Sequence, residues 1–152
     1  MKKITHLIIL MVSSLGFAQT PTSAAPTPPS RIASDVISIY GSAYANIAGV
    51  NTNPNWGQST VVTEEAIAGN NALKYANFNY QGTDWSGNPQ NISTMEYLHV
   101  DVWTDNQSPN VYVISSGAEI PHAISSVSGS WQSLNIPVAG ITGNLANTIQ
   151  FK

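Results

Sequence analysis

The sequence contains no cysteine and few charged residues. The absence of cysteine excludes a disulfide framework, a thiolate zinc site and a cysteine nucleophile. Charged residues make up 9% of the 152 positions, whereas an average soluble domain has about 25%. Five basic and eight acidic side chains give a net charge of −3 without a basic cluster. This balance argues against nucleic acid as a partner, because binding to phosphate backbones requires several Lys or Arg residues.

Uncharged polar residues take the place of the missing charges. The chain has 15 Asn, 18 Ser, 12 Thr and 7 Gln, about a third of its length. Hydrophobic residues still account for 42%, which is sufficient for one buried core. A chain of this length predicts a single domain, since domains usually contain about 100–200 residues.

The first 18 residues have the pattern of a secretory signal peptide. Lys2 and Lys3 precede the apolar run at residues 7–12, and Gly16 and Ala18 supply the small residues that a signal peptidase reads just before its cleavage position. The apolar run is too short to cross a bilayer as a helix, so we expect no membrane span. The pattern therefore predicts an exported protein, secreted or held at the cell surface, from which residues 1–18 are removed.

Residues 19–30 form a linker rich in Pro and Thr. The segment contains four prolines and no bulky apolar residue. Proline fixes φ and lacks an N–H group, so this segment cannot build a helix or a sheet ladder. We expect an extended, semi-rigid tether in front of a folded unit that comprises residues 31–152.

The folded unit has the hydrophobic period of β-strands and no sustained helical period. Residues 97–104 are the clearest case, with Leu98, Val100 and Val102 on one face and polar or aromatic residues on the other. Polar turns separate the segments. The pattern predicts an all-β fold, an antiparallel β-sandwich. Its strands are expected at residues 35–40, 59–63, 72–81, 97–104, 111–115, 123–127, 131–136 and 148–152, and a helical turn could form only within residues 138–147.

The chain stops within its last predicted strand, at residues 148–152. An unpaired edge strand is an aggregation hazard. We therefore expect that the sequence is a fragment that lacks a final strand.

Two tryptophans lie in polar loops and are the first candidates for ligand contact. Trp56 stands in NTNPNWGQS and Trp85 in NYQGTDWSGNPQN. Sugar rings stack their C–H faces on aromatic side chains, and their hydroxyls pair with amides and carboxylates. Trp103 and Trp131 fit better as plugs of the sandwich ends. The predicted carbohydrate-binding residues are Trp56, Trp85, Tyr80, Asn79, Gln81 and Asp84, and Asn77, Asn79 and Gln81 would share one strand face.

A catalytic role has little support in the sequence. A glycosidase needs two carboxyl groups across a cleft, whereas the adjacent Glu64 and Glu65 would point to opposite faces of a strand. A serine triad would need His99 or His122 as its base, and no Gly-x-Ser-x-Gly motif is present. No catalytic residue is predicted. The other two glutamates, Glu96 and Glu119, are typical of solvated surface carboxylates.

A structural calcium ion is an alternative use of the aspartates. Calcium prefers oxygen donors, which Asp35, Asp84, Asp101 and Asp105 would supply.

Several blocks of the sequence are familiar in their order. They are DVISIYGSAYANIAG, NPNWGQST, NNALKYANFNYQGTDW, MEYLHVDVWT, SWQSLNIPV and NTIQFK. Together they resemble the secreted β-sandwich modules of marine Bacteroidetes, which accompany laminarinase-like glycoside hydrolases or surface glycan-binding proteins. This resemblance covers nearly all of residues 32–152. It implies a galactose-binding-like jelly roll that holds polysaccharide without catalysis.

The resemblance also has consequences for the metal and for the end of the chain. Such modules often end in a further strand with an Asp-Asn-aromatic motif, which this sequence lacks. Many of them carry Asp where this chain has Ser42. Both differences argue against a structural calcium ion. The absent Asp-Asn-aromatic motif also supports the expectation that a final strand is missing from the sequence.

We therefore expect non-catalytic binding of an extracellular polysaccharide, with a β-glucan such as laminarin as the first candidate. Such binding would bring an attached or partner enzyme close to its polymer. Two alternatives stay open. One is an adhesion or structural module that packs on another protein domain, and the other is a small glycan-active enzyme domain.

Overall fold

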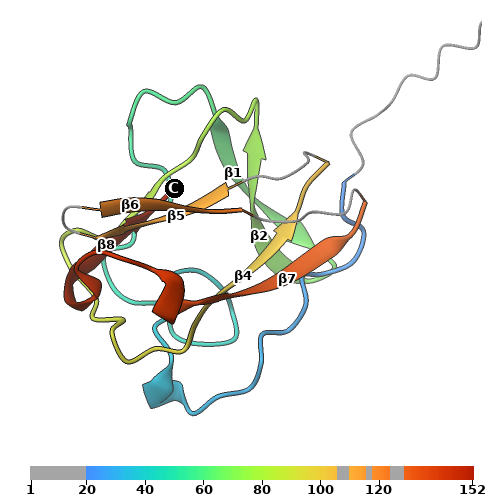
Figure 1. Ribbon diagram of the computed structural model, residues 1–152. Coiled ribbons are helices and arrows are strands. Elements are labelled where there is room, and N and C mark those ends of the chain that lie inside the picture. Colours follow the sequence, from blue (N-terminus) through green and yellow to red (C-terminus); the bar gives the residue numbers. More distant parts are fainter. Residues whose placement is uncertain (1–19, 106–109, 116–117, 124–128) are drawn as a thin grey trace, which may run out of the picture.

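The structure is a computed structural model that describes residues 20–105, 110–115, 118–123 and 129–152. Within these ranges the chain forms strands and single 3-10 turns, so the predicted all-β class is confirmed (Figure 1). The described residues contain no helix that is long and apolar enough to cross a membrane. The strands are β1 (Val61–Ile67), β2 (Asn70–Ala76), β3 (Thr83–Asp84), β4 (Tyr97–Trp103), β5 (Asn110–Ser115), β6 (Ala118–Ala123), β7 (Trp131–Pro137) and β8 (Thr148–Phe151), and the turns are η1 (Ala33–Asp35), η2 (Val138–Gly140) and η3 (Leu145–Asn147).

β1 and β2 form a hairpin around the two-residue turn Ala68-Gly69. Two-residue turns match the twist of the flanking strands when both residues have positive φ, and here φ is 49° at Ala68 and 85° at Gly69. β2 ends at Ala76, and the next residue, Asn77, has a φ of 51°. The predicted strand at residues 72–81 is therefore too long, because the left-handed residue turns the chain out of the ladder.

β8 is an inner strand of the four-stranded sheet β3-β8-β5-β6. Phe151 pairs with Val113 of β5, and Gln150 pairs with both Ile114 of β5 and Asp84 of β3. The expectation that β8 is an open edge is therefore wrong. One outer strand of this sheet, β6, shares only residue 123 with the strand predicted at residues 123–127. Residues 124–127 lie outside the described ranges.

β4 and β7 form a separate antiparallel pair along seven residues of each strand. Partners that stand directly opposite each other share a face. Leu98 packs against the buried core cluster, so its face of β4 points inward. His99 stands opposite Asn135, and Trp103 stands opposite Trp131. These residues therefore belong to the outer face, and the alternation predicted for residues 97–104 agrees with the register.

The N-terminal part of the folded unit departs from the predicted strand at residues 35–40. It contains the 3-10 turn η1 and one isolated bridge, from Ser38 to Asn46. The predicted strand at residues 35–40 is therefore wrong, because a 3-10 turn and one bridge take the place of a ladder. The two 3-10 turns η2 and η3 fall within residues 138–147, where a helical turn was the one exception expected.

The core lies between the β4–β7 pair and the four-stranded sheet. Val113 of β5 and Ile141 are 1% and 4% exposed, and Val138 of η2 is 3% exposed. Leu98 of β4 and Phe151 of β8 pack against this cluster. The core thus joins residues from both strand groups.

Thr148 carries a buried hydroxyl that lacks a partner. The residue is 0% exposed, and its Oγ1 has no hydrogen-bond partner among the described residues. An unpaired buried hydroxyl is costly, so Thr148→Val is expected to raise the free energy of unfolding by about 1 kcal/mol in urea denaturation.

Thr60→Val serves as the matched control for Thr148→Val. Thr60 is also buried, but its Oγ1 donates to the Tyr80 carbonyl at 2.6 Å. Valine at this position leaves that carbonyl without its donor and is expected to destabilise the fold by about 1–3 kcal/mol. Equal effects of the two substitutions would contradict the assignment of Thr148 as the unpaired residue.

Candidate functional site

A surface groove with a volume of ≈300 Å³ lies between the segment after β2 and the start of β5. This volume is at the lower end of the range found for ligand pockets. Three predicted site residues, Asn79, Tyr80 and Gln81, contribute to its wall. Among the residues that the structure describes, the lining consists of Phe78, Asn79, Tyr80, Gln81, Asn110, Tyr112 and Lys152.

The aromatic surface of the groove continues onto an exposed pair of rings. Phe78 and Tyr75 stack with their centroids 6.2 Å apart and an interplanar angle of 12°. They are 46% and 37% exposed, respectively. Solvent therefore reaches a flat apolar surface next to the amides of the groove, as a sugar ring requires.

Tyr112 and Lys152 form the opposite wall of the groove. Their backbones exchange two hydrogen bonds, of 2.6 Å and 2.9 Å. Nζ of Lys152 lies 5.0 Å from the centroid of the Tyr112 ring and also pairs with Glu119. The backbone pairing and the cation–π contact together hold the Tyr112 ring in place.

Tyr80 and Asn79 are held by the loop that precedes β1. Oη of Tyr80 donates to the Trp56 carbonyl at 2.6 Å. Oδ1 of Asn79 accepts a hydrogen bond from the Ser59 N–H at 2.9 Å, and the Asn79 backbone N–H donates to Thr60 Oγ1 at 3.2 Å. Both side chains are therefore preorganised, and Nδ2 of the Asn79 side chain takes no part in these contacts.

Gln81 is a buried member of the groove wall, 6% exposed. Its Nε2 donates to the carbonyls of Thr52 at 3.2 Å and Gly82 at 2.9 Å. Its Oε1 has no hydrogen-bond partner among the described residues. Gln81 thus anchors the groove segment to the 52–60 loop and keeps one acceptor unsatisfied.

Trp56 lies outside the lining of the groove and supports it from the loop. The side chain is half-buried, and its ring is packed on Gly82 so closely that a Cβ there would lie 2.0 Å from Cζ3. The backbone N–H of Trp56 donates to Oε1 of Gln58, and its backbone carbonyl accepts from Oη of Tyr80. Trp56 therefore links the 52–60 loop to the groove segment.

Trp85 does not fit the predicted ligand contact. It is 1% exposed, its Nε1 donates to the Thr148 carbonyl at 2.9 Å, and its ring packs edge-on against Phe151 at 4.7 Å. A ring without an exposed face cannot stack on a sugar. The polar neighbours of Trp85 suggested a loop surface, but the ring is buried against β8.

Asp84 uses its carboxylate within the fold. It accepts hydrogen bonds from the N–H and Oγ of Ser86 and from Gln150. Burial by itself would raise the pKa of Asp84, but these hydrogen bonds outweigh it and hold the pKa below the usual value. Asp84 is absent from the groove lining, so its expected sugar contact is not supported.

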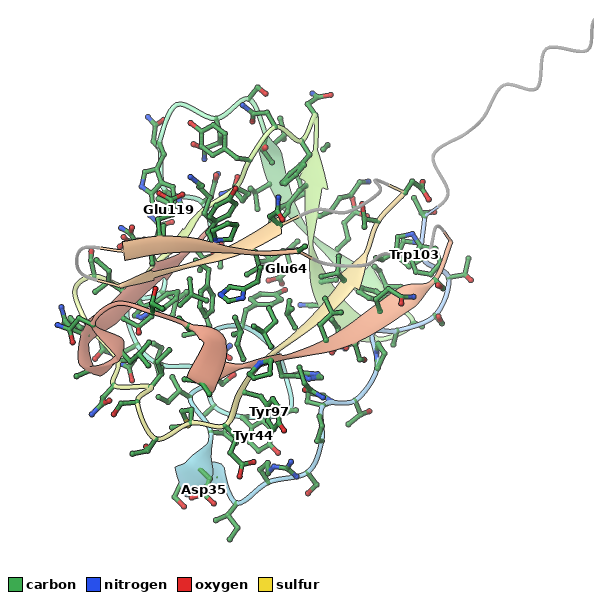
Figure 2. All side chains as sticks on the ribbon, in the orientation of Figure 1. Asp35, Tyr44, Glu64, Tyr97, Trp103 and Glu119 are labelled. Carbon is green, nitrogen blue, oxygen red and sulfur yellow. The ribbon has the colours of Figure 1, made fainter. Side chains whose placement is uncertain are left out.

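Three of the four glutamates considered for catalysis are engaged within the fold: Glu64 and Glu65 on β1, and Glu119 on β6. Glu64 accepts hydrogen bonds from Tyr40 at 3.0 Å and from Asn71 at 2.7 Å. Glu65 pairs with Lys74 at 2.8 Å. Figure 2 shows Glu64 and Glu119 on separate strands, and Glu119 pairs with Lys152.

His99 lies near Asp101 and Ser133, but the three side chains do not form a catalytic triad. Its Nε2 is 3.3 Å from an Asp101 oxygen and its Nδ1 is 2.8 Å from Oδ1 of Asn135. Oγ of Ser133 donates to Asp101, not to the imidazole. A nucleophilic serine needs the histidine as its base, so this group is a polar network across β4 and β7.

The four aspartates considered for calcium do not meet. Among the described residues, no three His, Asp or Glu side chains gather where they could hold a metal ion. Asp84 and Asp101 are engaged with Ser86 and Ser133. A calcium site built from these side chains therefore has no support in the described part of the chain.

Comparisons of this chain with protein-family models, with curated proteins and with solved structures give no match.

The sequence interpretation missed the larger part of the aromatic surface. Phe78 and Tyr75 were both assigned to the strand predicted at residues 72–81. In the structure this strand ends before Asn77, whose positive φ turns the chain. Tyr112 and Lys152 come from distant segments and meet only because β5 and the end of the chain pair. The sequence signal for this surface is the density of aromatic and amide residues in KYANFNYQ.

Proposed function

We propose that the chain is a non-catalytic module that binds extracellular polysaccharide in the groove between residues 78–81 and β5. The supporting observation is the exposed stack of Phe78 and Tyr75, which continues into a groove lined by Tyr80, Tyr112 and amide side chains. Aromatic faces next to planar polar groups suit the two surfaces of a sugar ring. The predicted function is kept, and its main site moves from Trp56 and Trp85 to this groove.

The remaining parts of the proposal rest on the sequence. A galactose-binding-like jelly roll and a β-glucan ligand such as laminarin follow from the family resemblance. Export and a covalently attached or co-secreted catalytic partner follow from the signal-peptide pattern and from the same resemblance. Low single-site affinity is expected, because sugar hydroxyls exchange hydrogen bonds with water for those with the protein.

Affinity gel electrophoresis tests the proposal with a panel of soluble polysaccharides: laminarin, mixed-linkage glucan, xylan, mannan and alginate. We expect one glycan to retard the chain, and Phe78→Ala and Tyr112→Ala each to weaken that binding about tenfold or more. Tyr97→Ala is the matched control, since Tyr97 is 52% exposed and lies outside the groove. Circular dichroism confirms that each variant is folded.

Other outcomes would contradict specific parts of the proposal. Binding lost in Trp56→Ala but kept in both groove variants would retain the function and reject the groove. Absence of retardation by every glycan, with a folded protein, would contradict glycan binding and favour a module that packs on another protein. Release of reducing sugar, abolished by Glu64→Gln or Glu119→Gln, would favour the enzyme alternative.

A further inference from the structure

The proline-rich segment at residues 20–30 lies against the folded unit. Nε1 of Trp131 donates to the Ser23 carbonyl at 2.9 Å, and Oη of Tyr44 donates to the Pro29 carbonyl at 3.1 Å. The Arg31 N–H then donates to Tyr44 Oη at 2.8 Å. The segment has no secondary structure, as predicted, but its two ends are anchored to aromatic side chains.

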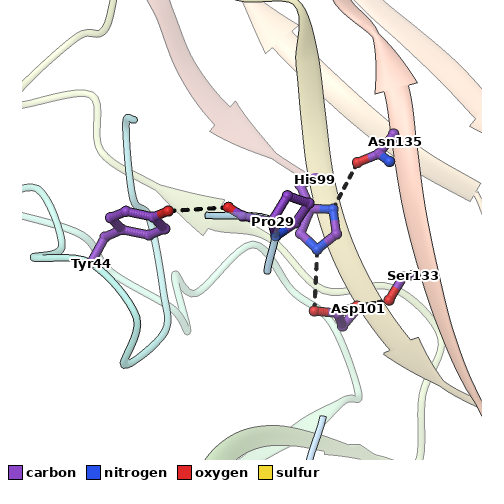
Figure 3. Close-up of polar contacts among 6 residues, drawn as sticks. All are labelled: Pro29, Tyr44, His99, Asp101, Ser133 and Asn135. Carbon is purple, nitrogen blue, oxygen red and sulfur yellow. Dashed lines mark hydrogen bonds and ion pairs between the residues drawn. The ribbon is translucent and has the colours of Figure 1, made fainter. Parts of the chain in front are cut away.

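One anchor, Trp131, belongs to the outer face of the β4–β7 pair, and the other, Tyr44, lies next to this face. Trp131 stands opposite Trp103, and the two rings pack edge-on with centroids 6.0 Å apart. In the view of Figure 3, Pro29 lies between Tyr44 and His99. The side chains of His99 and Asp101 point to this outer face, yet they are only 24% and 13% exposed. The outer face is therefore covered in part: His99 and Asp101 are shielded, whereas Tyr97 and Asn135 on the same face are exposed.

The dimensions of the segment and of the face agree. Ser23 and Pro29 are six residues apart, which corresponds to about 19 Å in a polyproline II conformation. The seven residues of β4 extend over about 20 Å, at roughly 3.3 Å per residue. One extended segment can therefore run along the whole strand pair and keep both anchors.

The chemistry of the contact is that of polyproline recognition. A polyproline II chain makes no internal hydrogen bonds, so its carbonyls are available to external donors. Aromatic side chains with an N–H or O–H group bind such chains through a flat apolar contact and a hydrogen bond. Residues 20–30 contain no charged side chain, which suits a surface that offers neutral donors.

We propose that the outer face of β4–β7, with Trp131 and Tyr44 as its anchors, is a recognition surface for extended proline-rich backbone. Residues 20–30 are its ligand within the same chain. The bound segment exchanges with an equivalent segment from outside, so that a second proline-rich chain of this chemistry can take its place. This surface is distinct from the groove: in Figure 2, Trp103 and Glu119, which pairs with the groove residue Lys152, lie on opposite sides of the molecule.

A fluorescent label on the segment tests the proposal in the full chain. Because the chain contains no cysteine, Thr22→Cys gives a single attachment site for bimane next to Ser23. Tryptophan quenches bimane on close contact, so we expect strong quenching in the folded protein and recovery in urea. Tyr44→Phe removes one anchor and is expected to shift the bound-to-free ratio about two- to tenfold toward free.

A variant of the segment itself keeps the folded unit unchanged. Replacing Pro26, Pro28 and Pro29 with glycine makes the segment flexible, and the larger entropy cost of binding should release the label. The synthetic peptide of residues 20–31 is the probe for exchange. It is expected to restore fluorescence in a saturable way, whereas the same peptide with glycine at these three positions should be much weaker.

Two results would overturn the proposal. A label as bright in the folded protein as in urea would show that the segment is not bound. A quenched label that the proline-rich peptide does not release at millimolar concentration would show that the segment is a fixed part of the fold and that the face recognises no second chain.

Discussion

Trp85→Ala is expected to lower the free energy of unfolding by about 3–5 kcal/mol. The ring is 1% exposed, packs edge-on against Phe151, and donates a hydrogen bond to the Thr148 carbonyl. Alanine leaves a cavity at the junction of β3 and β8 and removes one of the two hydrogen bonds that the Thr148 carbonyl accepts, the other coming from the Gln90 N–H. Urea denaturation followed by far-UV circular dichroism measures the effect.

The control for Trp85→Ala is Tyr97→Ala, which removes an aromatic ring that is 52% exposed. This change is expected to stay within about 0.5 kcal/mol. A similarly small effect of Trp85→Ala would contradict the burial of the ring. The result also matters for binding assays, because a loss of glycan binding in Trp85→Ala would report a weakened fold rather than a lost sugar contact.

Gly82→Ala is expected to destabilise the protein by about 1–3 kcal/mol or more through steric conflict. A Cβ at this position would lie 2.0 Å from Cζ3 of Trp56, so the ring or the backbone must move. Because Trp56 is half-buried, its displacement should also shift the tryptophan emission to longer wavelength. Thermal unfolding and intrinsic fluorescence provide the two measurements.

Gly87→Ala is the matched control for the second prediction. Gly87 has open space around the position of its Cβ and is absent from the positive-φ glycines of the chain. Alanine there should leave stability within about 0.5 kcal/mol or raise it slightly, since it restricts the unfolded chain. Equal stability of the two variants would contradict the contact between Trp56 and Gly82.

Local sequence patterns predicted the strands that the structure uses most regularly. The strict alternation at residues 97–104 corresponds to β4 (Tyr97–Trp103), and WQSLNI corresponds to β7 (Trp131–Pro137). A period of two determines which residues share a face whatever partner the strand finds. The same reasoning failed for residues 35–40, where the one pairing with another described residue is the bridge from Ser38 to Asn46.

The candidate groove was predicted in part. Asn79, Tyr80 and Gln81 follow from the amide-rich sequence next to an aromatic residue, and they line the groove. Tyr112 and Lys152 could not be added from the sequence, because the pairing of residues 40 positions apart depends on the whole sheet. The groove therefore combines one local segment with a long-range contact.

By itself the sequence determined the all-β class, the absence of cysteine and the lack of helix or strand at residues 20–30, since these depend on local periods, composition and the fixed φ of proline. Tertiary structure alone decided which tryptophan is covered and where the proline-rich segment lies. Trp85 and Thr148 are separated by 63 residues, and Ser23 and Trp131 by 108 residues. Contacts at such separations form only when the entire core closes, because burial is a property of the assembled surface and not of the neighbouring residues.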